Sequence, residues 1–125
     1  MRENDIGDVI VRGAMAVHSA LGPGLLESVY ELCLVRELSK AALRAERQIA
    51  LPVRYDDAEI NGGFRIDILV DGLVVIEVKA VEKVLPVHKA QLLTYLKLSG
   101  CRLGYLLNFN VPHMRDGINR LVNGL

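Results

Sequence analysis

The stretch FRIDILVDGLVVIEVK, residues 64–79, decides how this chain folds. Two runs of branched apolar residues, 64–70 and 73–79, flank the dipeptide Asp71-Gly72, a pattern typical of two antiparallel strands joined by a tight turn. Three charged residues, Asp67, Glu77 and Lys79, interrupt the apolar runs. We therefore expect a β-hairpin at the centre of the fold, with charged side chains built into it.

The length of the hairpin loop decides whether the two acids meet. A two-residue loop would separate Asp67 from Glu77. A three-residue loop, with Gly72 in the left-handed position of a bulge, places Asp67 opposite Val75 and one diagonal step from Glu77. We expect this second register. Because successive strand residues point to opposite faces, Glu77 and Lys79 also share a face with Val75.

Two carboxylates a diagonal step apart repel each other unless a positive charge lies between them, and hard oxygen ligands of this kind suit Mg²⁺ or Mn²⁺. The backbone carbonyl of Val78 offers a third oxygen. Lys79 is placed to orient or activate a metal-bound water and to stabilise charge on a phosphate. The alternative is a solvated sheet face on which Arg65, Asp67, Glu77 and Lys79 form cross-strand ion pairs, each worth less than ~1 kcal/mol.

Helical periodicity and chain breaks predict the other elements around the hairpin. The predicted order is α-α-β-β-β-α-β-α, which describes an α/β (α+β) fold with a small mixed sheet flanked by helices. The whole chain, residues 1–125, is predicted to form a single domain. The predicted elements are helices over 6–21, 25–43, 86–98 and 112–122, strands over 48–55, 64–70, 73–79 and 103–109, and a loop over 56–63.

The composition excludes several classes of protein. With 51% hydrophobic residues and 24% charged residues the chain can form a core without disulfides, and its two cysteines are expected to be free thiols. No apolar run approaches the ~20 residues of a membrane span. The N-terminus lacks the pattern of a secretory signal, so we expect a cytoplasmic protein with no membrane partner.

The formal net charge of zero argues against a protein that coats nucleic acid by bulk electrostatics. The charge is unevenly divided, because residues 1–78 hold eight Lys/Arg and thirteen Asp/Glu, whereas residues 79–125 hold seven and two. The basic residues around the third predicted helix are candidate phosphate contacts, although a plain polar helix face explains some of them equally well. They are Lys79, Lys83, Lys89, Lys97 and Arg102.

Further candidate residues lie on the predicted helices. Glu27 interrupts the most apolar helix in its first turn, where favourable interaction with the helix dipole is the simplest explanation, and Tyr30 lies on its face at i+3. Gln91 and Tyr95 share a face of the third helix at i and i+4. A core tyrosine with a satisfied hydroxyl is the alternative role for Tyr95.

These residues resemble the motifs of a known family. The segment GLLESVY, residues 24–30, resembles the signature of the GxxExxY proteins, and the rest is similar to the PD-(D/E)XK nuclease superfamily to which they belong. Asp67 with Glu77-Val78-Lys79 resembles the D…ExK core, and QLLTY, residues 91–95, resembles the Q-x-x-x-Y helix motif. The resemblance covers about residues 5–122. One departure is that Ile66, not proline, precedes Asp67.

The resemblance implies a restriction-endonuclease-like core and a metal-dependent nuclease that hydrolyses phosphodiester bonds, with DNA as the expected nucleic acid and Mg²⁺ or Mn²⁺ as the cofactor. It makes Asp67, Glu77 and Glu27 metal ligands and Lys79 the catalytic lysine. It gives Gln91 and Tyr95 a role in lining the site or contacting the substrate backbone. Together with Tyr30, Lys83 and Lys89, they form the expected substrate-binding set.

The alternative function is a catalytically silent module with the same fold that binds nucleic acid or a protein partner. The neutral net charge and the lack of a DNA-reading element favour it. A homodimer formed through the second helix or the strand edge near Pro52 is compatible with either function.

Overall fold

The structure is a computed structural model that describes residues 2–125. The apolar hairpin expected from the sequence is present as its two central antiparallel strands. The elements in chain order are α1 (Glu3–Leu21), α2 (Glu27–Lys40), β1 (Ala45–Ala50), β2 (Val53–Tyr55), β3 (Ala58–Ile60), β4 (Arg65–Val70), β5 (Val74–Lys79), α3 (Pro86–Ser99), β6 (Leu103–Asn108), the 3₁₀ turn η1 (Met114–Gly117) and β7 (Ile118–Val122).

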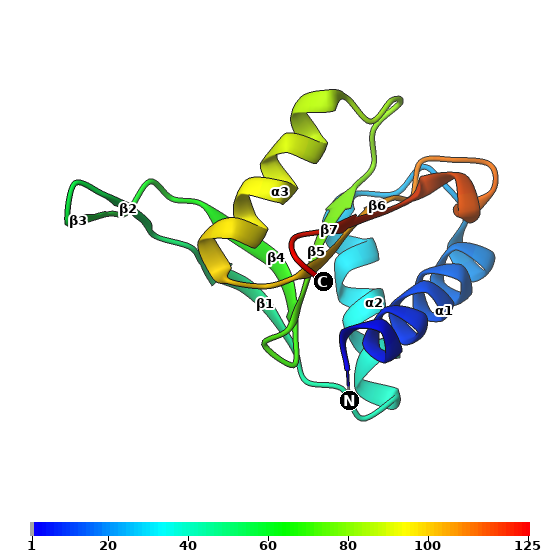
Figure 1. Cartoon of the computed structure of the whole chain (residues 1–125). Helices are drawn as coiled ribbons and strands as arrows, with labels where there is room; N and C mark the ends of the chain where they lie inside the picture. The colour runs from blue at the N-terminus through cyan, green and yellow to red at the C-terminus, as the bar shows by residue number, and fades with distance from the viewer. Residues whose placement is uncertain (1) are drawn as a thin grey trace.

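Five strands form one mixed sheet in the order β1-β4-β5-β6-β7, in which only the β5–β6 pair is parallel. Helix α3 connects these two parallel strands and covers one face of the sheet, while α1 and α2 cover the other (Figure 1). Strands β5 and β6 are buried along nearly their whole length because they lie between helices on both faces. The predicted fold class, a small mixed sheet flanked by helices, is confirmed.

Two apolar clusters hold the layers together. Val74, Ile76 and Val78 pack against α1 and α2, whereas Val75 packs against α3 with Leu92 and Leu96. This alternation places Glu77 and Lys79 on the α3 side of β5, as the sequence predicts.

The predicted register of the hairpin is wrong by one diagonal step. The observed pairs are Val70 with Val74, Leu69 with Val75 and Ile68 with Ile76, so the three-residue loop is 71–73. Asp71 and Gly72 both have positive φ, and Val70, which is fully buried, stays in the strand. When this register is extended, Asp67 lies level with Glu77 rather than opposite Val75.

The predicted strand over 48–55 is two strands. It begins earlier, as β1 at Ala45, and after Pro52 the chain enters a separate two-stranded hairpin, β2–β3, which includes residues predicted to be a loop. This hairpin projects from the body of the molecule as an arm (Figure 1).

The predicted helix over 112–122 is also wrong. Residues 118–122 form β7, which pairs antiparallel with β6. A short amphipathic segment has little helical stability of its own, and the otherwise open edge of the buried strand β6 needs a hydrogen-bonding partner. Within residues 2–125, no helix has the length and apolar character required to cross a membrane.

Candidate active site at the break between β4 and β5

The backbone ladder of the sheet is interrupted on both sides of Asp67. The pairing of β1 with β4 passes over Gln48 and Asp67, and the pairing of β4 with β5 ends at Ile68 and Ile76. Gln48 has a φ of +54°, which is uncommon for a residue other than glycine. The two faces of β4 also exchange sides at Asp67. Ile66 packs on the α3 side and Ile68 on the α1–α2 side, although residues two apart in a regular strand share a face.

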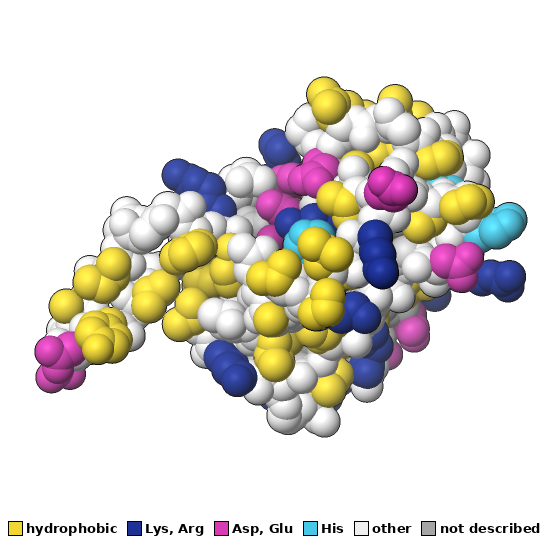
Figure 2. Space-filling view, turned by 90° about the horizontal axis from the view of Figure 1, so that it is seen from above, with side chains coloured by type: hydrophobic (Ala, Val, Ile, Leu, Met, Phe, Trp, Pro, Cys, Tyr) yellow, Lys and Arg dark blue, Asp and Glu magenta, His cyan; other side chains and the backbone are white. Residues whose placement is uncertain are grey.

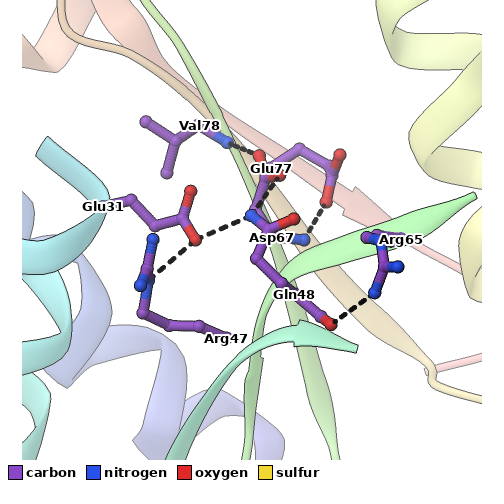
Figure 3. A network of polar contacts seen from close by, with 7 residues as sticks. All are labelled: Glu31, Arg47, Gln48, Arg65, Asp67, Glu77 and Val78. Atoms are coloured by element: carbon purple, nitrogen blue, oxygen red, sulfur yellow. Dashed lines mark hydrogen bonds and ion pairs between the residues drawn. The ribbon is translucent and has the colours of Figure 1, made fainter. Parts of the chain in front are cut away.

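Two carboxylates occupy the gap that this break leaves (Figure 3). The backbone N–H of Asp67 donates to Oε2 of Glu77 at 2.9 Å, and the N–H of Val78 donates to Oδ2 of Asp67 at 2.9 Å. Each carboxylate thus takes the place of a carbonyl that a regular ladder would supply. Because the N–H and C=O of a strand residue point to the same side, the carbonyl of Val78 also faces this gap.

The two carboxyl groups hold protons more tightly than usual. Burial, followed by the nearby charge of Asp67, raises the pKa of Glu77 to about 8, and only 5% of the Glu77 surface is exposed. Burial also raises the pKa of Asp67, and the carboxylate of Glu31 adds to this effect. Lys79 opposes both shifts, but no ion pair within 4.0 Å joins it to a carboxylate in the described chain. The pair is therefore short of positive charge.

These donors fit a hard divalent cation, since two carboxylates and a backbone carbonyl are ligands that Mg²⁺ and Mn²⁺ accept. A bound cation would also oppose the burial and the repulsion that raise the two pKa values. Across residues 2–125, however, no three acidic, His or Cys side chains converge as a metal-binding group. Any metal site here has two carboxylates, and its remaining ligands come from the backbone, water or substrate.

Glu27, expected as a third acid of the site, lies beside the end of β5. It is exposed, and its Oε2 accepts a hydrogen bond from the N–H of Ala80 at 3.1 Å, just beyond the end of β5. Glu31, one helical turn further along α2, is the acid whose charge acts on both Asp67 and Glu77. Sequence analysis missed Glu31, although its spacing from Leu34 and Leu38 places it on the buried stripe of the helix.

Gln48 is the second residue that sequence analysis missed. Its Nε2 donates to Oε1 of Glu31 at 2.9 Å and makes a longer hydrogen bond of 3.5 Å to Oδ1 of Asp67 (Figure 3). Nothing in the sequence marks an exposed polar residue in an edge strand as part of a site. Only the left-handed backbone at Gln48 and the approach of α2 bring it there.

Gln91 and Tyr95 lie together on α3, as their spacing predicts. Nε2 of Gln91 donates to the hydroxyl of Tyr95 at 3.2 Å. Burial, and then the charges of Glu77 and Asp67, raise the pKa of Tyr95, so this hydroxyl lies within electrostatic reach of the carboxylates. The ring of Tyr95 also meets Phe64 edge-on, with centroids 6.3 Å apart.

Tyr30 does not have the place expected of a substrate-binding residue. It is fully buried, its ring stacks on Phe109, and its hydroxyl donates to the carbonyl of Gly22 at 2.6 Å and accepts from the N–H of Leu25. These contacts close the turn between α1 and α2. Tyr30 is therefore a structural residue, because a side chain buried in this way cannot touch a nucleic-acid backbone.

Of the expected phosphate contacts, Lys83 and Lys89 are exposed, whereas Arg102 is paired with Glu3 of α1. Lys83 lies in the connection between β5 and α3, and Lys89 lies in the first half of α3. In the view of Figure 2, acidic side chains gather near the middle of the face, with Lys and Arg side chains around them. Such an arrangement combines an acidic centre with a basic margin.

A comparison with protein families finds that residues 4–121 match the family model described as the PD-(D/E)XK nuclease superfamily. No curated protein and no solved structure matches the chain significantly.

Proposed function

Because the chain belongs to the PD-(D/E)XK nuclease superfamily, we propose that it is a metal-dependent nuclease whose reacting centre is the gap between Asp67 and Glu77. The observation that supports this most directly is the pair of level carboxylates at the break in the ladder, both with raised pKa values. Perturbed acids in a polar gap of this kind are typical of functional sites.

Asp67, Glu77 and the carbonyl of Val78 would hold Mg²⁺ or Mn²⁺. The metal, when bound, would supply a water of lowered pKa and a positive charge for a phosphate oxygen. The protein itself fixes the two carboxylates through the N–H groups of Asp67 and Val78, so their oxygens need little rearrangement. Glu31 adds negative charge behind them and strengthens the attraction for a cation.

Lys79 would act next to this pair as the catalytic lysine. It follows Glu77 by two residues on the same face of β5, and no carboxylate neutralises it within 4.0 Å in the described chain. Its ammonium group is thus available to orient a water and to stabilise charge that builds up on a phosphate during hydrolysis. Glu27 of α2, which accepts a hydrogen bond from the N–H of Ala80 just after this strand, would hold the backbone that carries Lys79.

The substrate would be nucleic acid, with DNA as the preferred candidate. Lys83 and Lys89 would contact phosphates at the margin of the site, and Gln91 with Tyr95 would border it on the α3 side. We also propose that the chain is a GxxExxY protein within the superfamily, on the GLLESVY signature of residues 24–30. In this structure the signature tyrosine, Tyr30, closes the turn that precedes α2.

The test is cleavage of labelled DNA and RNA, each single- and double-stranded, with Mg²⁺, Mn²⁺ or EDTA. We expect metal-dependent cleavage of at least one substrate. Lys79→Met should abolish it without loss of folding, whereas Lys40→Met, at the exposed last residue of α2, should retain it.

Two results would contradict the proposal. Full activity of Lys79→Met would show that Lys79 has no catalytic role. The absence of both cleavage and metal binding by calorimetry would favour a silent module that holds nucleic acid or a protein partner with the same fold.

A further inference from the structure

The side-chain amide of Gln48 lies between two carboxylates. One of them, Glu31, is 4% exposed, and the other is Asp67. The amide nitrogen donates one hydrogen bond to each of them, at 2.9 Å to Glu31 and 3.5 Å to Asp67. An amide suits this position because it carries two donors and no charge.

Gln48 is itself held in place from several sides. Nε of Arg47 donates at 3.0 Å to the same Glu31 oxygen that accepts from Gln48, and Nη1 of Arg65 donates at 3.4 Å to the backbone carbonyl of Gln48 (Figure 3). The φ of +54° turns the backbone of β1 out of its ladder at this residue. A strained backbone at such a point persists only when its surroundings require it.

We propose that Gln48 is a positioning residue for the nuclease site, which orients the Asp67 carboxylate by linking it to Glu31 of α2, itself paired with Arg47 of β1. This inference rests on the proposed function. The link fixes Oδ1 of Asp67 while Val78 fixes Oδ2, so that the carboxylate presents its remaining lone pairs in one orientation. Residues that orient a ligand in this way typically affect metal affinity 10–100-fold.

The test measures Mn²⁺ affinity by calorimetry and cleavage kinetics for Gln48→Gly and Gln48→Ala. Both variants remove the amide, but glycine accepts a positive φ without strain. Asp57→Gly is the matched control, because Asp57 also has a positive φ of 59° and lies at the tip of the β2–β3 arm. Thermal unfolding without metal shows whether each variant is folded.

We expect Gln48→Gly to unfold at a temperature close to that of the wild type and yet to bind Mn²⁺ roughly tenfold more weakly. Its kcat should fall at saturating metal while its KM for nucleic acid stays nearly unchanged. Asp57→Gly should keep the wild-type affinity. Gln48→Asn, whose side chain is one methylene shorter, should also bind Mn²⁺ more weakly than the wild type.

Wild-type affinity and kcat in Gln48→Gly would overturn the inference and leave the proposed function intact. A loss of affinity in Gln48→Ala alone would also overturn it, since the backbone strain and not the amide would then be responsible. A wild-type protein that binds no Mn²⁺ and cleaves nothing would instead overturn the proposed function, and the inference with it.

Discussion

Asp67 is the residue at which regular β structure stops. The N–H and C=O of a strand residue normally enter a ladder with one neighbouring strand, but Asp67 is absent from the pairings with both β1 and β5. Its N–H binds a carboxylate of the neighbouring strand, and its own carboxylate binds the N–H of Val78. The polar groups of the gap are thus satisfied locally, although two acids are brought together at the edge of an apolar core.

The raised pKa of Glu77 gives a pH dependence to stability. Between the ordinary carboxyl pKa of 4.5 and about 8, the folded protein keeps a proton on Glu77 that the unfolded chain releases. Stability without metal therefore falls as the pH rises through this window. We expect Glu77→Gln in EDTA to raise the free energy of unfolding by roughly 1–3 kcal/mol at about pH 8.5 and by much less at about pH 5.

Chemical denaturation at the two pH values measures this difference. Glu59→Gln is the control, because Glu59 is exposed on the β2–β3 arm and should show no such contrast. If Glu77→Gln raised the free energy of unfolding equally at both pH values, the ionisation of Glu77 would not oppose folding.

The two acids of α2 are expected to contribute unequally to metal binding. The charge of Glu31 contributes to the raised pKa values of Asp67 and Glu77, whereas Glu27 accepts a hydrogen bond from the N–H of Ala80. Glu31→Gln should therefore weaken Mn²⁺ binding by about threefold or more, and Glu27→Gln should change it by less than about twofold. Calorimetry under identical conditions compares them. A larger loss for Glu27→Gln would show that Glu27 reaches the metal when it is bound.

Among the elements, β6 illustrates how a neighbour can determine secondary structure. All of its residues are buried, and α3 and β5 account for only part of its surroundings. The chain therefore returns as β7 along the free edge, after passing very close to the end of β6 at Gly117. A Cβ atom on Gly117 would collide with the carbonyl oxygen of Asn108, which is backbone and cannot move aside.

Gly117→Ala should accordingly destabilise the protein by about 2 kcal/mol or more, because the collision pushes η1 and β7 away from β6. The free energy of unfolding from urea titration measures the effect. Asp116→Ala is the neighbouring control, since Asp116 is exposed and should change stability by less than about 0.5 kcal/mol. Equal stability of both variants would mean that the approach of the two segments is not tight.

At the scale of the whole molecule, the net charge is zero, but acidic and basic residues are separated. The gap is acidic, and its margin is basic. The acids Glu31, Asp67 and Glu77 meet between α2 and the centre of the sheet, while Lys83 and Lys89 are exposed on the connection after β5 and on α3. Without a cation, the acidic gap repels phosphate. Nucleic-acid binding should therefore depend on metal as well as on ionic strength.

In the Lys79→Met variant, which we expect to be inactive, Ca²⁺ should tighten DNA binding by about tenfold or more relative to EDTA, because the cation neutralises the two carboxylates next to the phosphate. Fluorescence anisotropy at fixed ionic strength measures the affinity. In a variant that also carries Asp67→Asn and Glu77→Gln, the Ca²⁺ effect should disappear. If it persisted there, the cation would be acting elsewhere on the protein or on the DNA.

The sequence alone predicts the fold class, the central hairpin, the three long helices and the face that Glu77 shares with Lys79, because these follow from local periodicity and turn signals. It also indicates Asp67 and Glu77 as acids that meet. It could not predict β7, because the same residues satisfy a weak helical pattern until β6 requires a partner.

Only the tertiary structure decided which residues surround the two acids. The left-handed backbone at Gln48 and the break in both ladders are set by long-range packing of β1, β4 and α2, and local sequence carries no signal for them. The same packing brings Glu31 close to the two acids, holds Glu27 at the end of β5 and buries Tyr30 in the turn before α2. Sequence periodicity places a residue on a face of its own element, whereas the contact across elements depends on how those faces meet.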